Sequence, residues 1–291
     1  MQPSFTVEEF LSYRFIVPPL SEQQAIANYL DEQVDKIEEL IAEQKIAIEK
    51  WKSYKQSLIT ETVTKGLNPN VEMKDSGIEW IGKIPKEWEV NKIKRMCYLK
   101  GRIGWQGLKA SEFIEDGPYL VTGTDFKNGR VEWESCYHIS NERFVEAPEI
   151  HLKKDDLLIT KDGTIGKLAY IDFLPGLTSL NSHLLLIRPT NNQCLNKFLF
   201  WMFSSSIFKF YTGLAQGGSI MESLSQKKIG EFSIPLPQLQ EQQAIADFLD
   251  EKCSKIDQTI EQKQTLIKQL EEYKQSLIYE CATGKRCVEE R

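Results

Sequence analysis

The sequence is poor in the residue combinations that build metal sites and disulfide frameworks. Its 291 residues include six cysteines and three histidines, and no two cysteines have the two-residue spacing typical of zinc ligands. Scattered thiols of this kind argue against a zinc site and against a fold held together by disulfides. We therefore expect no metal and no other cofactor.

Long apolar runs are missing as well. No stretch approaches the roughly 18 to 20 uninterrupted apolar residues that a membrane-spanning helix needs. The amino terminus also lacks the charged-then-apolar pattern of a secretory signal. Hydrophobic residues nevertheless make up 41% of the chain, enough for a buried core. The expected location is the cytoplasm.

Motifs of catalysis are also absent. The sequence has no glycine-rich cofactor loop after a strand, and no Asn-Pro-Pro-aromatic or Asp-Pro-Pro-aromatic methylation motif. KDGTIGKL, from Lys161, comes closest to a phosphate-binding loop, but it lacks the first glycine and the hydroxyl residue after the lysine. Asp155, Asp156 and Lys161 could form a nuclease-like set, but acidic residues are common at strand ends. The sequence favours a protein that is not an enzyme.

An excess of positive charge is lacking too, since the net charge is −6. This is unusual for a nucleic-acid-binding protein, whose affinity comes largely from Lys and Arg that neutralise phosphates. The acidic excess lies in two flanking segments: residues 18–75 carry 7 basic and 11 acidic residues, and residues 236–291 carry 8 and 11. Residues 76–235 between them carry 20 basic and 18 acidic residues. Any nucleic-acid contact is expected in this middle part.

What the sequence does contain is an internal repeat. PPLSEQQAIANYLDEQ, from Pro18, aligns with PQLQEQQAIADFLDEK, from Pro237. The two copies keep a constant offset of 219 residues over nearly fifty positions, and about half of these positions are identical. Similarity of this length without a gap indicates two copies of one structural unit.

Each copy has the apolar spacing of a coiled-coil helix, with apolar residues at alternating intervals of three and four. Polar residues stand at the same seam positions in both copies, Gln44 with Lys263 and Lys55 with Lys274, and could fix the register at some cost in stability. We predict two long spacer helices that form an antiparallel coiled coil. The predicted helix-pairing residues are Val34, Ile37, Ile41, Ile48, Trp51, Leu58, Cys253, Ile256, Ile260, Ile267, Leu270 and Leu277.

The block between the repeats, residues 76–235, has aromatic residues, short β-like runs and frequent glycine turns. KKDDLLITKDGTIGKLAYID predicts two strands joined by a turn at Asp162-Gly163. SHLLLIRP, from Ser182, predicts a further buried strand, and NKFLFWMFSSSIFKFYTG, from Asn196, predicts an apolar helix. Because the repeats bracket this block, we expect one independently folded domain. The expected fold class is α+β, with one mixed domain flanked by two long helices.

Several segments resemble the specificity subunits of type I restriction-modification systems. DSGIEWIGKIPKEWEVNKIKRM, from Asp75, is similar to the start of a target-recognition domain, and DDLLITKDGTIGK, from Asp155, is similar to a strand-turn-strand within it. IGEFSIPLPQLQEQQAIADFLDEKCSKID, from Ile229, resembles the junction between recognition domain and conserved helix. FLSYRFIVPPLSEQQAIANYLDEQVDKIE, from Phe10, repeats that junction. The resemblance covers nearly the whole chain.

The resemblance implies recognition domains alternating with helices, each domain reading one half of a split site in double-stranded DNA. It also implies that methylation and cleavage belong to partner modification and restriction subunits. The chain departs from the full pattern, because Ser4 aligns with Ser223 and Phe15 with Ile234, and the rest of a first recognition domain does not precede them. The expected organisation is the end of a truncated preceding recognition domain (1–17), a first spacer helix and linker (18–75), a target-recognition domain (76–235), and a second spacer helix and tail (236–291).

DNA reading requires side chains that reach base edges, together with cations and amides that contact phosphates. Such groups approach DNA most easily from polar loops that carry glycine. Asn181 and His183, beside a strand, are expected to be structural. The candidate DNA-binding residues are Lys100, Arg102, Trp105, Gln106, Thr122, Thr124, Lys127, Asn128, Arg130, Lys161, Thr164, Lys167, Gln216 and Ser219. The expected base readers among them are Arg102, Gln106, Lys127 and Asn128.

Assembly and function leave alternatives open. One domain reads a short half-site, so two chains could pair through their helices and read an inverted repeat with a fixed gap. A second specificity chain could supply the other domain instead. The chain could also be an inactive remnant, or a coiled-coil adaptor that binds protein and no DNA. DNA affinity that falls steeply with salt distinguishes a DNA reader from an adaptor.

Overall fold

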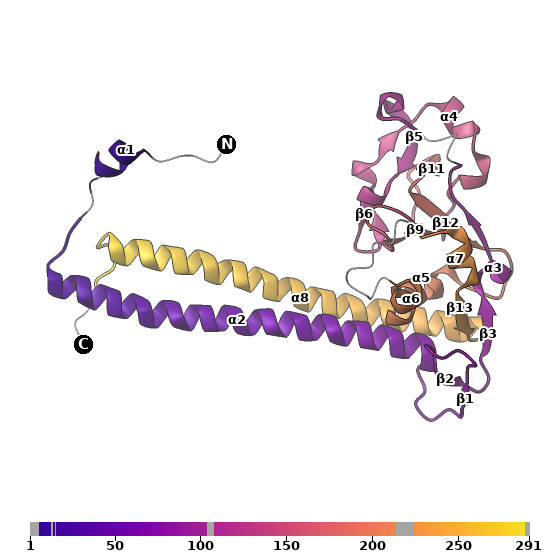
Figure 1. Ribbon diagram of the computed structural model, residues 1–291, viewed down its shortest axis with the longest axis horizontal. Helices are drawn as coiled ribbons and strands as arrows, with labels where there is room; N and C mark the ends of the chain where they lie inside the picture. Colours follow the sequence, from indigo (N-terminus) through magenta and orange to yellow (C-terminus); the bar gives the residue numbers. More distant parts are fainter. Residues whose placement is uncertain (1–5, 13, 15, 104–107, 214–223, 289–291) are drawn as a thin grey trace. The chain divides into compact units, whose positions relative to one another are not determined.

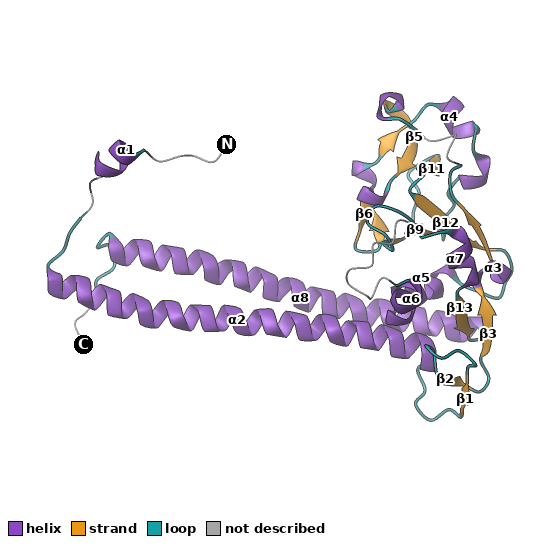
Figure 2. Cartoon of the chain, in the orientation of Figure 1, coloured by secondary structure: helices purple, strands orange, loops and turns teal. Residues whose placement is uncertain are grey.

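The computed structural model in Figure 1 describes residues 6–12, 14, 16–103, 108–213 and 224–288. The chain divides into two compact units, one of residues 1–52 with 256–291 and the other of residues 53–255. Two long helices, α2 (Leu20–Lys65) and α8 (Leu239–Ala282), contribute to both units. All described strands belong to the second unit, as Figure 2 shows in orange. No described helix is long and apolar enough to cross a membrane.

The first unit is built on a pair of helices. Lys263 Nζ on α8 donates a hydrogen bond to Gln44 Oε1 on α2 at 2.9 Å, and Lys274 Nζ donates to Glu38 Oε1 at 3.2 Å. Residue numbers thus rise along α8 as they fall along α2, so the predicted antiparallel coiled coil is confirmed. The apolar cluster of this pair contains Ile26, Tyr29, Leu30, Ile37, Ile41, Ile267, Leu270, Leu277 and Cys281.

The predicted helix-pairing residues are all buried or half-buried, but two of them serve a different core. Leu58 and Cys253 pack into the hydrophobic cluster of the second unit, because α2 near its end and α8 near its start contribute to that cluster. Five further predicted helix-pairing residues are buried or half-buried but lie outside the apolar cluster of the first unit: Val34, Ile48, Trp51, Ile256 and Ile260.

The contact between Gln44 and Lys263 joins equivalent positions of the internal repeat, since the two residues are 219 apart. When two equivalent helices pair antiparallel, a contact between equivalent positions marks the two-fold axis of the pair. The repeat extends to the flanking elements: α1 (Val7–Ser12) has the same offset from α7 (Gln226–Glu231). The starts of α2 and α8 are also 219 residues apart.

The polar layer at this axis leads to a stability prediction. Replacing Gln44 and Lys263 together by leucine is expected to raise the free energy of unfolding by roughly 1–2 kcal/mol, because two half-buried polar side chains become apolar. We also expect a weaker preference for one register, since polar seam residues specify it. Thermal unfolding followed by circular dichroism measures the first effect. The matched control is leucine at the exposed neighbours Lys45 and Gln264; a lower midpoint in the Gln44/Lys263 variant than in this control would contradict the prediction.

The second unit includes residues 76–235, which we call the middle domain, and the largest described sheet of this segment has four antiparallel strands. Their order is β10 (Leu168–Tyr170), β9 (Leu157–Thr160), β12 (Leu184–Pro189) and β4 (Cys97–Lys100). The predicted strand-turn-strand and the predicted strand in SHLLLIRP are therefore confirmed. β9 is buried along its whole length, as expected of a central strand with both faces covered.

A second sheet has the order β11 (Thr178–Leu180), β5 (Ile114–Val121) and β8 (Tyr137–His138), with β11 parallel to β5 and β8 antiparallel to it. A separate two-stranded hairpin joins β6 (Phe126–Lys127) to β7 (Arg130–Val131). Short 3-10 turns lie at Ala110–Glu112, Gly123–Asp125, Trp133–Ser135 and Pro148–Ile150.

Two short ladders complete the β structure. The first pairs β1 (Met73–Asp75) with β2 (Lys83–Pro85), and the second pairs β3 (Glu89–Lys92) with β13 (Ser233–Leu236). α3 (Ile93–Met96) follows β3 and packs against α7, the helix that precedes β13. The second ladder therefore joins the beginning of the middle domain to its end.

The predicted apolar helix from Asn196 is divided into two, α5 (Asn196–Ser204) and α6 (Ser206–Thr212). Ser205 between them has an extended backbone, and its hydroxyl accepts a hydrogen bond from the Phe208 amide at 3.4 Å. A serine in this conformation is a favoured N-cap, so it starts a new helix instead of continuing the old one. The prediction of one continuous helix was wrong at this residue.

The hydrophobic core of the second unit combines the middle domain with the adjoining turns of the long helices. Ile59 and Val63 come from α2, and Ile245 and Leu249 come from α8. Trp88 is only 2% exposed, and its indole Nε1 donates to Glu241 Oε2 at 2.9 Å. The largest fully buried aromatic residues of the cluster are Trp88, Phe198, Phe203, Phe208 and Phe232.

Candidate nucleic-acid interface

Several strand ends meet at one edge of the middle domain. The ladders align Leu184 with Thr160 and Leu186 with Lys100, so β4 and β9 end where β12 begins. The Asn181 amide donates to the Val121 carbonyl at 3.0 Å, which brings the end of β5 to the same edge. We call residues 100–102, 122–124, 161–167 and 181–183 the strand-end loops. They contain the candidates Lys100, Arg102, Thr122, Thr124, Lys161, Thr164 and Lys167.

The loop after β9 is shaped by a buried threonine. Thr160 is 2% exposed, and its hydroxyl donates to the Thr164 carbonyl at 2.5 Å and accepts from the Lys167 amide at 2.9 Å. The Lys161 amide donates to the His183 carbonyl at 2.9 Å, which joins this loop to the start of β12. Gly163 has a φ of +66°, a conformation that favours glycine. The segment is a hairpin connection, as predicted.

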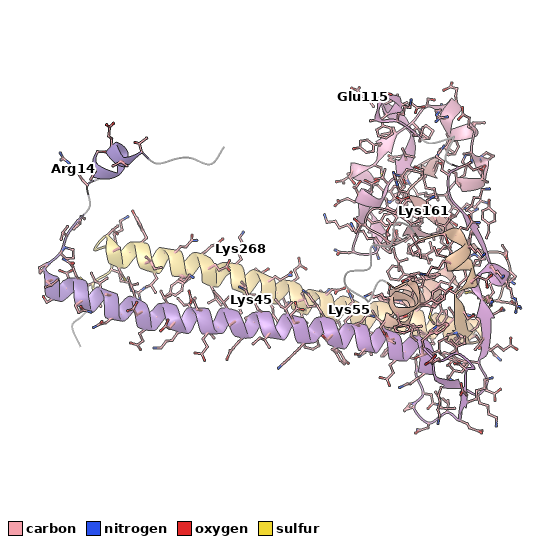
Figure 3. All side chains as sticks on the ribbon, viewed as in Figure 1. Arg14, Lys45, Lys55, Glu115, Lys161 and Lys268 are labelled. Carbon is pink, nitrogen blue, oxygen red and sulfur yellow. The ribbon has the colours of Figure 1, made fainter. Side chains whose placement is uncertain are left out.

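A cavity of about 390 Å³ opens among these loops. Adding a Cβ at Gly101 would place it 3.0 Å from the Leu184 carbonyl oxygen and 3.7 Å from Lys161 Nζ, so the ammonium group of Lys161 lies close to the Gly101 backbone. Figure 3 labels Lys161 in the middle domain. The lining residues are Lys100, Gly101, Arg102, Ile103, Lys161, Asp162, Leu185, Leu224, Ser225 and Gln226.

The two threonines of TGTDFKNGR differ in exposure. Thr122 is 9% exposed, and its amide donates to Asp125 Oδ2 at 2.7 Å. The hydroxyl groups of Thr122 and Thr124 lie 2.7 Å apart, and Thr124 is exposed. Burial and the Asp125 carboxylate raise the pKa of the Cys136 thiol to about 12, so this cysteine stays protonated. Of the two threonines, Thr124 is the one that faces solvent.

The β6–β7 hairpin presents a second group of candidates. Asn128 has a φ of +51° and Gly129 a φ of +77°, as in the Asn-Gly turns that favour two-residue hairpins. Lys127 Nζ lies 2.6 Å from Glu132 Oε1, and hydrogen bonding to Glu132 raises the pKa of Lys127. Arg130 Nη1 lies 3.2 Å from Asp172 Oδ2. Such exposed ion pairs are weak, so a phosphate can replace the acid at little cost.

Arg102 lies inside the domain and is only 2% exposed. Its Nε donates to the Leu180 carbonyl at 3.0 Å and its Nη2 donates to Ser179 Oγ at 3.0 Å. Burial lowers the pKa of Arg102, and the nearby Arg143 guanidinium lowers it further. The sequence predicted a base reader at Arg102, but these contacts tie the end of β4 to β11. The buried position argues for a positioning role instead.

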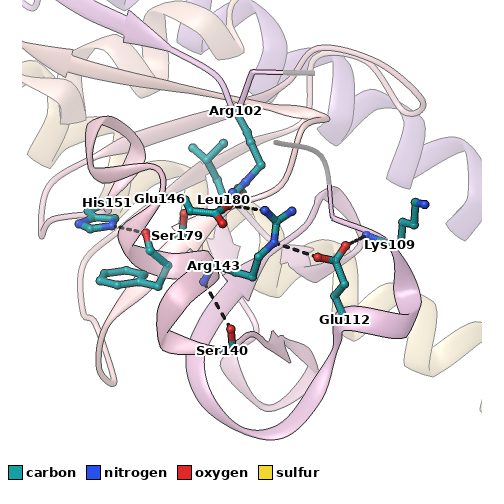
Figure 4. A network of polar contacts seen from close by, with 10 residues as sticks. Arg102, Lys109, Glu112, Ser140, Arg143, Glu146, His151, Ser179 and Leu180 are labelled. Atoms are coloured by element: carbon teal, nitrogen blue, oxygen red, sulfur yellow. Dashed lines mark hydrogen bonds and ion pairs between the residues drawn. The ribbon is translucent and has the colours of Figure 1, made fainter. Parts of the chain in front are cut away.

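Figure 4 shows the polar network around Arg102. Arg143, on α4 (Asn141–Val145), has its Nε 2.9 Å from Glu112 Oε1 and also pairs with Glu146. Glu112 in turn accepts a hydrogen bond from the Lys109 amide at 2.7 Å. Two arginines beside several carboxylates hold this part of the domain together.

Other predicted and unpredicted residues can also be placed. His183 contacts Asp162 at the strand-end loops, and Asn181 Oδ1 accepts from the His183 amide at 3.0 Å, which agrees with the structural role expected of Asn181.

Leu224, Ser225 and Gln226 of the cavity were not predicted, since no sequence signal connects α7 with the strand ends. The candidates Trp105, Gln106, Gln216 and Ser219 lie outside the described residues.

The acids of the alternative nuclease-like set are engaged in other contacts. Asp156 is 1% exposed, and its carboxylate accepts from Arg188 Nε at 2.7 Å and from Arg188 Nη2 at 2.6 Å. Asp155 Oδ1 accepts from the Tyr170 hydroxyl at 2.6 Å. Among the described residues, no group of three or more His, Cys, Asp or Glu side chains could hold a metal ion.

The sequence model of one protein family, described as the type I restriction modification DNA specificity domain, matches residues 85–272. The chain belongs to this family. The match begins just before β3 and ends within α8, so it covers the strand-end loops and the cavity. It also includes every described residue of the middle domain that was predicted to contact DNA.

Relatives of this specificity family match over most of the chain. The chain is 26% identical over 284 residues to the type I restriction enzyme MjaVIII specificity subunit of Methanocaldococcus jannaschii, which covers 95% of this chain and 63% of that protein. It is 22% identical over 239 residues to the type I restriction enzyme EcoBI specificity subunit of Escherichia coli, covering 79% of this chain and 49% of that protein. The chain thus spans less than two thirds of the length of these relatives.

Solved structures share the fold of this specificity family. A chain from the study "Structural basis underlying complex assembly and conformational transition of the type I R-M system" matches with a TM-score of 0.71 at 17% identity, covering 93% of this chain and 61% of that one. The HsdS subunit from Thermoanaerobacter tengcongensis matches with a TM-score of 0.55 at 17% identity, covering 98% of this chain and 64% of that one. At this identity the likeness establishes the fold alone.

Proposed function

We propose that the chain is a non-catalytic, sequence-specific DNA-recognition part of a type I restriction-modification complex. In this role the middle domain binds one half of a split site in double-stranded DNA. Partner modification and restriction subunits then carry out methylation and cleavage. The observation that carries the proposal is the gathering of Lys100, Lys161, Thr164 and Lys167 at one sheet edge in a chain of the specificity family.

The distribution of charge in the middle domain supports DNA binding more strongly than the small overall excess of basic over acidic residues suggests. Residues 109–149, inserted between β4 and β9, carry 9 acidic and 4 basic residues. The remaining residues of 76–235 carry 16 basic and 9 acidic residues. Strands β4, β9 and β12, which bear most of the strand-end loops, belong to this basic part. An adaptor that binds only protein has no need for such a separation of charge.

The internal repeat supports a second docking place for a recognition domain. Ile59 and Ala246, buried against the middle domain, correspond to Ile278 and Ala27, which are exposed. We call the surface at Ile278 and Ala27 the second platform. It fits another recognition domain, carried by the same polypeptide or by another specificity chain. A homodimer paired through the helical seam would have to compete with the pair already formed within the chain. Two domains on one helical pair would read the two halves of a split site at a fixed gap.

The proposed function predicts that Asn128 contributes to base choice. Glycine is the appropriate substitution, because it tolerates the positive φ of residue 128 and removes only the amide. In the complex with its modification subunits, Asn128→Gly is expected to relax the preference at one base pair by about 1–3 kcal/mol. A methylation map of cellular DNA, with the wild-type chain as reference, measures the preference.

The same experiment tests the function itself. Lys268→Gln, on α8 in the first unit, serves as the control and is expected to leave the methylated motif unchanged. An absence of any motif that depends on this chain, with all subunits present and folded, would favour the adaptor or remnant instead. Unchanged base preference in Asn128→Gly would remove this residue from the base readers while leaving the function intact.

A further inference from the structure

The cavity at the strand-end loops has the character of a binding site for an anion. We infer that it binds a phosphate ester of a nucleotide, and that in the DNA complex it receives one backbone phosphate with its sugar. The inference rests on the proposed DNA-recognition function and names the chemical group that the cavity binds. It assigns roles to Lys100 and Lys161 as phosphate ligands.

The two lysines that line the cavity are free to meet a ligand. Among the described residues, neither Lys100 nor Lys161 has an acidic side chain within ion-pair distance, whereas Lys92, Lys127 and Lys197 each contact an acid. Lys161 Nζ lies near the Gly101 backbone, and both residues line the cavity. Two ammonium groups beside one cavity, with no ion-pair partner in the ranges that the structure describes, attract a group of negative charge.

Arg102 is a further cation of the lining, although its guanidinium is bound to Leu180 and Ser179. Arg102 lines the cavity, and its Nη1 is buried without a hydrogen-bond partner among the described residues. An unsatisfied buried donor is costly, and more so when it belongs to a charged group. The one acid of the lining, Asp162, contacts His183. An anion in the cavity would therefore meet more positive than negative charge.

The size of the cavity indicates more than a bare ion. Its volume of about 390 Å³ falls in the range of pockets that hold small organic ligands. Ile103, which is 40% exposed, supplies apolar surface beside the lysines, and the buried Leu185 and Leu224 lie behind it in the lining. A sugar attached to the phosphate can pack on Ile103. The 2.5 Å hydrogen bond from the Leu224 amide to the Lys161 carbonyl holds this wall against the β9 loop.

The test uses the full-length chain with three probes: a duplex that contains its methylated motif, deoxyadenosine monophosphate, and inorganic phosphate. Lys100→Gln and Lys161→Gln are compared with Lys154→Gln, an exposed lysine at the opposite end of β9. Duplex affinity is measured at several salt concentrations, and binding of the small probes is measured by calorimetry. Lys161→Arg, which keeps the charge, is the rescue variant. Thermal midpoints equal to that of the wild type establish that each variant folds.

We expect each glutamine variant at the cavity to lower duplex affinity about three- to tenfold at low salt, for every sequence alike. Each should also reduce the dependence of log affinity on log salt by about one unit, as the loss of one phosphate contact requires. Saturable binding of deoxyadenosine monophosphate that requires Lys161, with unchanged duplex binding, would identify a free nucleotide as the source of the phosphate. If Lys100→Gln and Lys161→Gln behave like Lys154→Gln with all three probes, the inference is overturned.

Failure of the inference and failure of the proposed function give different results. A wild-type chain that binds duplex DNA with salt dependence, but whose cavity variants are unchanged, retains its function and loses the phosphate site. A wild-type chain that binds no duplex, but binds the nucleotide in a manner that depends on Lys161, keeps the phosphate site and loses the proposed DNA-recognition function.

Discussion

Replacing Asp156 by alanine is expected to lower the free energy of unfolding of the second unit by about 3 kcal/mol, at the lower end of the range for breaking a buried ion pair. The Asp156 side chain is 2% exposed and that of Arg188 is 25% exposed, so the arginine would lose its partner in a largely dry environment. The Lys153 amide would also lose the Asp156 carboxylate, which it now reaches at 2.6 Å. A guanidinium keeps its proton at any ordinary pH, so Arg188 cannot escape the cost by becoming neutral.

Urea unfolding followed by tryptophan fluorescence measures this effect. The matched control is Asp172→Ala, which removes an exposed aspartate paired with Arg130 and should change stability by no more than about 1 kcal/mol. Replacing both partners, with Asp156→Leu and Arg188→Met, should recover much of the loss because no charge is then left unpaired. Equal stability of the Asp156 and Asp172 variants would show that the buried pair is not important for stability.

Replacing Ile59 by alanine is the second change with a large expected effect. Ile59 is 4% exposed and belongs to the main core of the second unit, so the deletion leaves a cavity and should cost about 2–5 kcal/mol. The internal repeat provides a matched control of the same residue type on the equivalent helix position. Ile278 is 41% exposed, and Ile278→Ala should cost well under half as much. Chemical unfolding of the two variants under the same conditions gives the comparison.

The same pair of positions tests the second platform. Ile278→Asp is expected to leave the isolated chain folded and to weaken its association with another recognition domain, because an apolar contact at that position would gain an unpaired charge. Mass measurement of the assembled complex reports the loss. If the complex assembles with Ile278→Asp as it does with the wild type, the surface at Ile278 is not a docking place for a recognition domain. A large loss of stability in the isolated Ile278→Ala variant would contradict the exposed position of this residue.

The charge pattern reconciles the acidic sequence with the proposed DNA binding. The net charge of −6 describes the whole chain, whereas phosphates respond to the charges within about 10 Å in ordinary salt. Lys100 and Lys161 have no acidic partner within the described part of the chain, while Lys127 and Arg130 already have carboxylates nearby. We therefore expect Lys100 and Lys161 to contribute to DNA affinity without any rearrangement. Lys127 and Arg130 should contribute only after a phosphate replaces their carboxylate partners.

The sequence alone determined the helices, their antiparallel pairing and the strands around the β9–β10 turn. Helical and strand periodicities are local properties, and the internal repeat adds a long-range constraint, because two copies with the same seam are suited to pack on each other. The contact of Gln44 with Lys263 follows from that equivalence. The division into α5 and α6 was missed because the serine run gives no local sign of which serine caps a helix.

Only the tertiary structure decided which polar residues of the glycine-bearing loops face solvent. Arg102 and Lys161 have similar sequence surroundings and both line the cavity, yet Arg102 is buried against β11 whereas Lys161 is only half-buried. Leu224, Ser225 and Gln226 join that cavity from a segment some sixty residues further along the chain than Lys161. The physical reason is that exposure and cavity walls depend on packing between distant segments, whereas periodicity and turn chemistry depend on neighbours in the chain.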